Sequence, residues 1–459
     1  MGLIKELPGL LRRAVKRHEV PGASLAIMRN GRVTAKAVAG VTNLDTKVPV
    51  TEDTLFQIGS ITKTQTATLV MQLVDEGRLD LDTPVRQYLP KFRVADLDVS
   101  RKVTARHLLS HQSGIDGDFF VDSGRGDDNI ERIVAMATMV PSLFPIGEKL
   151  SYCNLGFAVL GRIIEVVTGQ SWDAVLKERL FDPLGMDHAF SQPEQAIRFS
   201  CAIGHVPGPS KKQPWITTPQ PYLSLGQKSA GATPTMTATD LLAFAAMHMN
   251  GGKAADGSKV LSAASVRAMQ QRQIRTPKHT PHHIAGWGLG WMLIDWNGHK
   301  LYGHDGGTLG QFAFLRILPE KGLAVAMLTN GGDAPALYQE MFGTIFKSFA
   351  RVQLPDLPET HDDIKVDLDA LSGRYGNLNQ VLDFKPYRDG LRVGIIPNGA
   401  DATDDYMKLA FIDKDTARLA TGDVMWDRNI IKFSSYADGI PGHAALGLRQ
   451  YKRLGSAPA

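Results

Sequence analysis

The stretch that most constrains the fold is a change from an extended to a helical pattern between residues 54 and 77. Phe56 and Ile58 alternate with polar residues as in a strand, and Gly59 permits a tight turn. From Ile61 onward, apolar residues recur at helical spacing until Gly77, a residue typical of a helix C-terminus. The sequence therefore predicts a strand, a tight turn and a helix in direct succession.

Ser60 and Lys63 stand at the start of this expected helix. Unpaired backbone N–H groups and the positive end of the helix dipole favour a developing negative charge at Ser60. Lys63 follows three residues later, so one helical turn brings both side chains to the same face. A lysine that is partly desolvated in a cleft can lose its proton near neutral pH and activate a serine. The pair is a candidate nucleophile and base; the alternative is a helix-capping serine beside a surface lysine.

The remaining pattern predicts an α+β fold. Residues 1–19 read as an amphipathic helix, and residues 23–28 and 32–38 as a hairpin turning at Asn30-Gly31. Helical patterns near residues 104, 154 and 238 make up a mostly helical middle, and residues 289–328 read as strands. We expect the early and late strands to pair in one antiparallel sheet flanked by helices. The polar stretch from Asp116 to Asp128 is expected to be a mobile loop on a rim.

A change in composition near residue 350 predicts the domain organisation. Residues 350–367 are rich in proline and acidic residues, as in a linker, whereas residues 1–349 carry the elements described above. Residues 368–459 contain short aromatic runs separated by turn dipeptides such as Asp389-Gly390 and Asp438-Gly439. This rhythm is typical of a small β-barrel.

Charge, cysteine content and hydropathy exclude several functional classes. A net charge of +4 over 459 residues gives no indication of nucleic-acid binding, and no stretch is long and apolar enough to span a membrane. Two cysteines, Cys153 and Cys201, cannot make a disulfide framework. We therefore expect a cytoplasmic location, or a secreted or periplasmic one if a signal peptide has been removed. The sequence is compatible with a homo-oligomer as well as with a monomer.

Two further polar groups accompany the Ser60–Lys63 pair. Tyr152 precedes a predicted helix and offers a phenol for proton transfer, and Asn154 offers an amide that can orient its neighbours. His304 and Asp305 lead into a glycine-rich strand. Each group alone is compatible with a purely structural role, and it is their order along the chain that makes the combination informative.

In this order, the motifs resemble those of the serine β-lactamase and penicillin-binding-protein superfamily. The resemblance covers roughly residues 10–345 and is greatest to the branch with class C β-lactamases, D-Ala-D-Ala carboxypeptidases, D-aminopeptidases and esterases. It is carried by Ser60-Ile61-Thr62-Lys63, Tyr152-Cys153-Asn154, His304-Asp305-Gly306, Val20-Pro21-Gly22 and Phe181-Asp182-Pro183-Leu184-Gly185-Met186. The C-terminal pattern more weakly resembles lipocalin-like barrels appended to some members.

The resemblance implies a serine hydrolase whose catalytic domain is residues 1–349. Ser60 would attack a carbonyl to form an acyl-enzyme, while Lys63 and Tyr152 exchange protons. The backbone N–H groups of Ser60 and Gly307 would form the oxyanion hole. Substrate-orienting residues would be Asn154, His304, Asp305 and Gly306. The expected substrate is a small molecule or peptide, such as a D-amino-acid amide or a small ester, with no cofactor or metal.

Two departures and several alternatives accompany this interpretation. His304 stands where related proteins often have a lysine, and Asp305 where a threonine is usual, which weakens the expectation of carboxylate recognition through this motif. A β-lactamase, or a penicillin-recognising protein without turnover, remains an alternative. An α/β-hydrolase is disfavoured because no serine lies in a Gly-x-Ser-x-Gly elbow. His279, His282 and His283 lie close together in the sequence, but we do not expect them to form a metal site.

Overall fold

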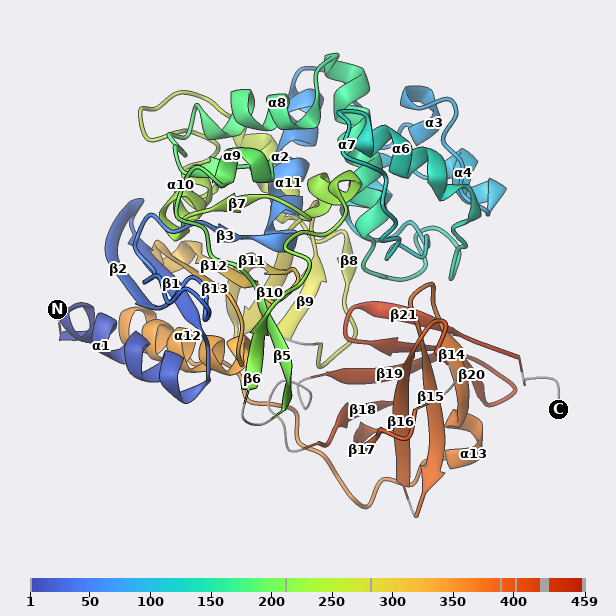
Figure 1. The fold of residues 1–459 in the computed structure, drawn as a ribbon. Coiled ribbons are helices and arrows are strands. Elements are labelled where there is room, and N and C mark those ends of the chain that lie inside the picture. The colour runs from blue at the N-terminus through green and yellow to red at the C-terminus, as the bar shows by residue number, and fades with distance from the viewer. Residues whose placement is uncertain are drawn as a thin grey trace.

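A computed structural model describes residues 2–210, 213–280, 283–388, 390–400, 403–421 and 429–455. Its centre is an antiparallel sheet with the strand order β2-β1-β13-β12-β11-β10-β9-β8 (Figure 1). The strands are β1 (Gly22–Arg29), β2 (Arg32–Gly40), β8 (Ile274–Arg275), β9 (Ile284–Trp287), β10 (Met292–Trp296), β11 (His299–Gly307), β12 (Phe312–Leu318) and β13 (Leu323–Thr329). The first hairpin thus pairs with the last strand of the sheet, as the sequence predicts, through contacts such as Ala26 opposite Ala326.

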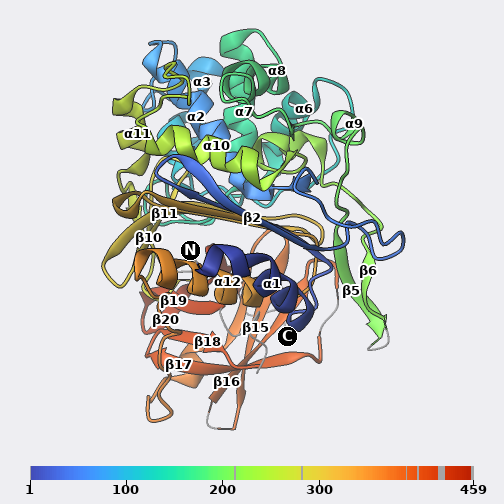
Figure 2. The same ribbon diagram turned by 90° about the vertical axis from the view of Figure 1, so that its left-hand side faces the viewer.

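Helices cover both faces of this sheet (Figure 2). On one face, α1 (Gly2–Arg17) and α12 (Ala334–Ala350) bury Leu7, Leu11 and Phe342 against the strands. On the other face lies α10 (Ala238–Met249), with the mostly helical part of the molecule beyond it. That part contains α2 (Thr62–Asp75), α3 (Val85–Tyr88), α4 (Leu97–Lys102), α5 (Ala105–Leu109), α6 (Asn129–Met136), α7 (Asn154–Thr168), α8 (Trp172–Leu176), α9 (Pro193–Ala196) and α11 (Ala263–Gln270).

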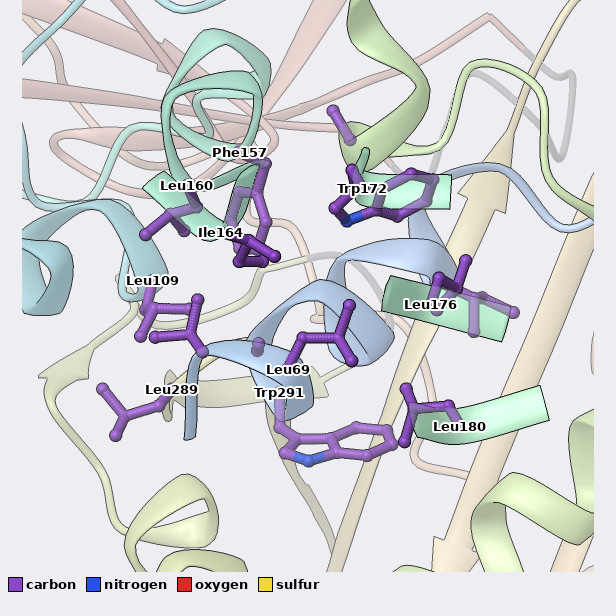
Figure 3. Packing of buried hydrophobic residues seen from close by; sticks show 14 of the residues in the cluster. Leu69, Leu109, Phe157, Leu160, Ile164, Trp172, Leu176, Leu180, Leu289 and Trp291 are labelled. Carbon is purple, nitrogen blue, oxygen red and sulfur yellow. The ribbon is translucent and has the colours of Figure 1, made fainter. Parts of the chain in front are cut away.

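A second hydrophobic core fixes the helix that follows Ser60. Figure 3 shows Phe157 and Ile164 of α7 among the side chains packed around Leu69 of α2, with Trp291 beneath them. These side chains are fully buried or nearly so. Close packing of this kind leaves little freedom for α2 to rotate, so it also fixes the direction in which its first turn points.

Short strands outside the main sheet complete this part of the chain. A three-stranded sheet joins β3 (Phe56–Gln57), β7 (Thr235–Met236) and β4 (Ala189–Phe190), and a separate hairpin joins β5 (His205–Ser210) to β6 (Gln213–Thr217). β3 is the extended lead-in to Ser60 that the sequence predicts. No helix of the described residues is long and apolar enough to cross a bilayer.

The C-terminal part forms a closed barrel that lies beside the helical part and one end of the main sheet (Figure 1). After the short helix α13 (Leu368–Leu371), its strands are β14 (Gly373–Gly376), β15 (Gln380–Tyr387), β16 (Gly390–Pro397), β17 (Tyr406–Asp413), β18 (Thr416–Leu419), β19 (Ile430–Ala437), β20 (Ile440–Leu446) and β21 (Arg449–Arg453). Its core contains Tyr375, Phe384 and Phe433, three of the aromatic residues whose spacing indicates a barrel. The predicted α+β fold with a C-terminal β-barrel is therefore confirmed.

The segment from Asp116 to Asp128 lies differently from the rim loop that we expect from its polarity. It contains no helix or strand, but Asp116 and Asp118 are buried. Asp116 accepts a hydrogen bond of 2.6 Å from the backbone N–H of Leu378, next to β15. The start of this stretch is therefore held by the barrel through Asp116 and Asp118, whereas Asp122 and residues 125–128 are exposed to solvent.

Candidate active site

Ser60 lies in a single 3-10 turn, Gly59–Ile61, which runs directly into α2. Gly59 has a φ of +51°, and a Cβ there would lie 2.6 Å from the backbone nitrogen of Gly307. A Cβ on Gly306 would lie 1.9 Å from the carbonyl oxygen of Ile58. Only glycine therefore lets β11 run this close to the turn. The result is that the Gly307 amide sits beside the residue that precedes Ser60.

Lys63 is fully buried one turn after Ser60. Its Nζ lies 3.0 Å from Ser60 Oγ, 2.7 Å from Asn154 Oδ1 and 2.6 Å from the Ala230 carbonyl oxygen. Burial, followed by the positive charge of Arg449, holds the pKa of Lys63 well below its usual value. A neutral amine has two N–H donors and one lone pair. In that form the two acceptor oxygens, Asn154 Oδ1 and the Ala230 carbonyl, can take both donors, and the lone pair is then available to accept the proton of the Ser60 hydroxyl.

Tyr152 packs directly on this amine. Lys63 Nζ lies 4.8 Å from the centroid of the Tyr152 ring. The centroid of the buried His111 ring lies 4.3 Å from the centroid of the Tyr152 ring. Burial raises the pKa of the Tyr152 phenol, and this outweighs the opposing effect of the nearby Ser60 hydroxyl. The phenol is therefore neutral at neutral pH, the state in which it can give a proton to a leaving group.

His304 and Asp305 occupy β11 but differ in their surroundings. His304 is fully buried, its Nδ1 lies 2.6 Å from the carbonyl oxygen of Asp305, and burial lowers the pKa of His304 to about 3. It is therefore neutral. The carboxylate of Asp305 is bound at both oxygens by Arg316, at 2.6 and 3.0 Å, and Arg316 is itself completely buried. Asp305 thus belongs to an ion pair in which only the carboxylate reaches the surface.

Two residues of the site escape the sequence analysis: Asp118 and Arg449. The Asn154 amide donates to Asp118 Oδ1 at 2.6 Å, and the Arg449 guanidinium pairs with both Asp118 oxygens through Nε and Nη2. A continuous series of hydrogen bonds therefore runs from the barrel residue Arg449 through Asp118, Asn154 and Lys63 to Ser60. Asp118 and Arg449 lie 331 positions apart in the sequence, and no local pattern connects them.

These residues surround one cavity of about 610 Å³ between the main sheet and the barrel. From the part of the chain before the barrel it is lined by Ser60, Asp118, Tyr152, His304, Asp305, Gly306 and Gly307, among others. From the barrel it is lined by Asn377, Gln380, Leu446, Leu448 and Arg449, among others. The structure thus brings the predicted residues together around one opening, with Lys63 and Asn154 directly behind it. Among the described residues, no three histidine, cysteine or acidic side chains are placed to hold a metal ion, and His282 lies outside these residues.

Comparison with known proteins places the chain among proteins of related sequence and fold. Penicillin-binding protein 4 of Amycolatopsis lactamdurans is 44% identical over 361 residues, which are 78% of this chain and 93% of that protein. The crystal structure of SurE with D-Leu superposes with a TM-score of 0.76 and 27% identity, covering 99% of this chain and all of that one. A D-amino acid amidase from Ochrobactrum anthropi SV3, complexed with D-phenylalanine, gives a TM-score of 0.60 and 25% identity over 72% of this chain and 93% of its own.

The family assignment rests on most of the chain. The model of the Beta-lactamase family matches residues 7–347, from the first turns of α1 to the last turns of α12, and so includes Ser60, Lys63 and Tyr152. The chain belongs to the Beta-lactamase family.

Proposed function

We propose that this protein is a serine hydrolase that forms an acyl-enzyme on Ser60 and cleaves an amide or ester bond. The observation that carries the proposal is the contact of 3.0 Å between Ser60 Oγ and the buried Lys63 amine, whose other two contacts are acceptor oxygens. A surface lysine beside a capping serine, the alternative left by the sequence, would be exposed to water and would remain charged. Lys63 is neither.

In the proposed reaction, Lys63 takes the proton of Ser60 as Oγ attacks the carbonyl carbon. The backbone N–H groups of Ser60 and Gly307 stabilise the oxyanion, and each donor of this kind typically contributes about 10²–10³ in rate. The neutral phenol of Tyr152 protonates the leaving group. Deacylation reverses these roles, with water or another nucleophile attacking the ester. Asn154 holds Lys63 from behind.

We propose a D-amino-acid amide, a D-peptide or a small ester as the substrate class. Two of the similar structures were determined with D-leucine and D-phenylalanine, which supports an amino-acid-type ligand. A cavity of about 610 Å³ is large enough for a dipeptide-sized molecule. A β-lactamase, or a penicillin-binding protein without turnover, is the second candidate, supported by the 44% identity to penicillin-binding protein 4.

A turnover panel on the purified full chain separates these candidates. It compares p-nitrophenyl esters, D- and L-amino-acid amides, and nitrocefin, with the Ser60→Ala variant as the control. The proposal expects turnover of esters and D-amides that is absent in the variant. Stoichiometric, slowly reversed labelling by nitrocefin without ester or amide turnover would favour a penicillin-recognising protein instead.

A further inference from the structure

The hairpin between β20 and β21 is fixed against the catalytic part on both sides of Arg449. The Leu448 carbonyl oxygen accepts a hydrogen bond of 2.8 Å from the backbone N–H of Tyr152. The backbone N–H of Gln450 donates to Ser151 Oγ at 3.2 Å. A residue held between two such contacts has a defined position relative to Tyr152, although it belongs to the barrel.

The Arg449 guanidinium uses only part of its hydrogen-bonding capacity in the pair with Asp118. Its side edge, Nε and Nη2, faces the Asp118 carboxylate. Nη1 has no hydrogen-bond partner among the described residues. The end edge, formed by Nη1 and the second N–H of Nη2, therefore keeps the parallel donors that bind a carboxylate in bidentate geometry.

Exposure is distributed unequally within this pair. The Arg449 side chain is 38% exposed and lines the cavity, whereas the Asp118 side chain is 8% exposed and is also bonded to Asn154. Asp118 and Asp305 also line the cavity, but their carboxylates are bound by Arg449 and Arg316, respectively. Of the described residues that line the cavity, Arg449 alone is a lysine or arginine. Because His304 is neutral, the positive charge that a substrate meets here comes from the barrel.

The position of Arg449 relative to Tyr152 indicates which part of a substrate would contact the guanidinium. The guanidinium carbon lies 5.2 Å from the centroid of the Tyr152 ring. In the proposed reaction, Tyr152 protonates the leaving group, so Arg449 lies on the leaving-group side of the scissile bond.

We propose that the end edge of Arg449 is a carboxylate-binding subsite for the leaving group, so that the enzyme prefers amides or esters whose leaving group carries a carboxylate. This inference rests on the proposed acyl-enzyme function and gives its substrate a chemical class. The barrel then contributes directly to specificity. The ion pair with Asp118 keeps the guanidinium oriented, so little ordering remains to be done when a carboxylate binds.

A matched pair of esters tests the subsite. Both carry the same N-phenylacetylglycyl acyl group, and their leaving groups are 3-hydroxybenzoate and 3-hydroxybenzamide, which have similar shape but differ in charge. The measured quantity is the ratio of kcat/KM for the carboxylate ester to kcat/KM for the amide-bearing ester. We compare wild type, Arg449→Gln, Arg449→Lys and, as a control, Arg374→Gln, since Arg374 is an exposed arginine on the barrel strand β14.

The wild-type protein and the control are expected to prefer the carboxylate ester at least tenfold. Arg449→Gln should bring the ratio close to one, and Arg449→Lys should give an intermediate ratio because a lysine keeps the charge but not the two parallel donors. An unchanged ratio in Arg449→Gln would overturn the subsite, as would a wild-type ratio near one.

A second measurement needs no variant and stands even if Arg449→Gln fails to fold. Free 3-hydroxybenzoate should inhibit wild-type turnover of the neutral ester at least tenfold better than 3-hydroxybenzamide, and added salt should weaken only the benzoate. Equal inhibition by the two would contradict the inference. If both esters acylate Ser60 at equal rates, only the subsite is refuted. If neither ester acylates Ser60, the proposed function is refuted and the subsite with it.

Discussion

The charges of Asp118 and Arg449 should tune the Lys63 base in opposite directions. Asp118 raises the pKa of Lys63 and Arg449 lowers it. Asp118→Asn removes the negative charge but keeps an oxygen that accepts from Asn154. It should therefore lower the pKa of Lys63, so that the amine becomes neutral at a lower pH. Arg449→Gln should raise that pKa.

The magnitude follows from the geometry. Lys63 Nζ and Asp118 Oδ1 are joined through the Asn154 amide by contacts of 2.7 and 2.6 Å. Two such hydrogen bonds and the width of an amide place the charges about 7 Å apart, which at an effective dielectric constant of about 20 gives roughly 2 kcal/mol. Since one pKa unit corresponds to about 1.4 kcal/mol, we expect Asp118→Asn to shift the pKa by about one to two units.

The assay is the pH profile of kcat/KM for a p-nitrophenyl ester, followed at a wavelength where product absorbance is independent of pH. Activity should rise with pH as Lys63 loses its proton. This acidic limb should move to lower pH in Asp118→Asn and to higher pH in Arg449→Gln. A shift of both variants in the same direction, or lower plateau rates with no movement of the limb, would refute the view that these charges act on Lys63.

Three further predictions concern the same region. Lys63→Ala and Tyr152→Phe should each lower kcat/KM about as much as the double variant, because both serve one proton transfer; losses that multiply would show independent action. Asp305→Asn leaves Arg316 buried without its counter-charge and should lower the free energy of unfolding in urea by about 3–5 kcal/mol, whereas a surface role for Asp305 predicts almost no change. Burial raises the pKa of Asp116 to about 6, above the roughly 3.9 of an unfolded chain. The folded state therefore holds a proton that the unfolded chain has lost, and stability falls as pH rises from about 4 to about 6. The free energy of unfolding of Asp116→Asn should then exceed that of wild type by about 2–3 kcal/mol at pH 8 and by less at pH 5. An equal difference between variant and wild type at the two pH values would contradict this.

The sequence predicts local relationships in this protein well. Ser60 and Lys63 lie one helical turn apart, so their contact follows from the 3.6-residue period. Tyr152 and Asn154 are close because only one residue separates them at the start of α7. The hairpin of β1 and β2 is equally local. The sequence does not predict β8, because a strand of two residues, Ile274–Arg275, is too short to show alternation.

The long-range part of the site was beyond sequence reasoning. Arg449 looks like any polar residue at the start of a short strand, and Asp118 like any acidic residue in a loop. Their pairing depends on how the barrel docks against the helical part, and no periodicity encodes that docking. The same limit applies to Asp305, because nothing local in the sequence pairs it with Arg316 on the neighbouring strand β12.

Covalent labelling of the Ser60 hydroxyl tests the central claim, that Ser60 is the nucleophile, most directly. Purified wild-type protein, Ser60→Ala and Lys63→Ala are treated with a fluorophosphonate probe, and intact-mass spectrometry with peptide mapping locates the adduct. We predict one adduct per chain on Ser60 in the wild type, none in Ser60→Ala and much slower labelling in Lys63→Ala. Equal labelling of Ser60→Ala, or an adduct on another residue, would contradict the account.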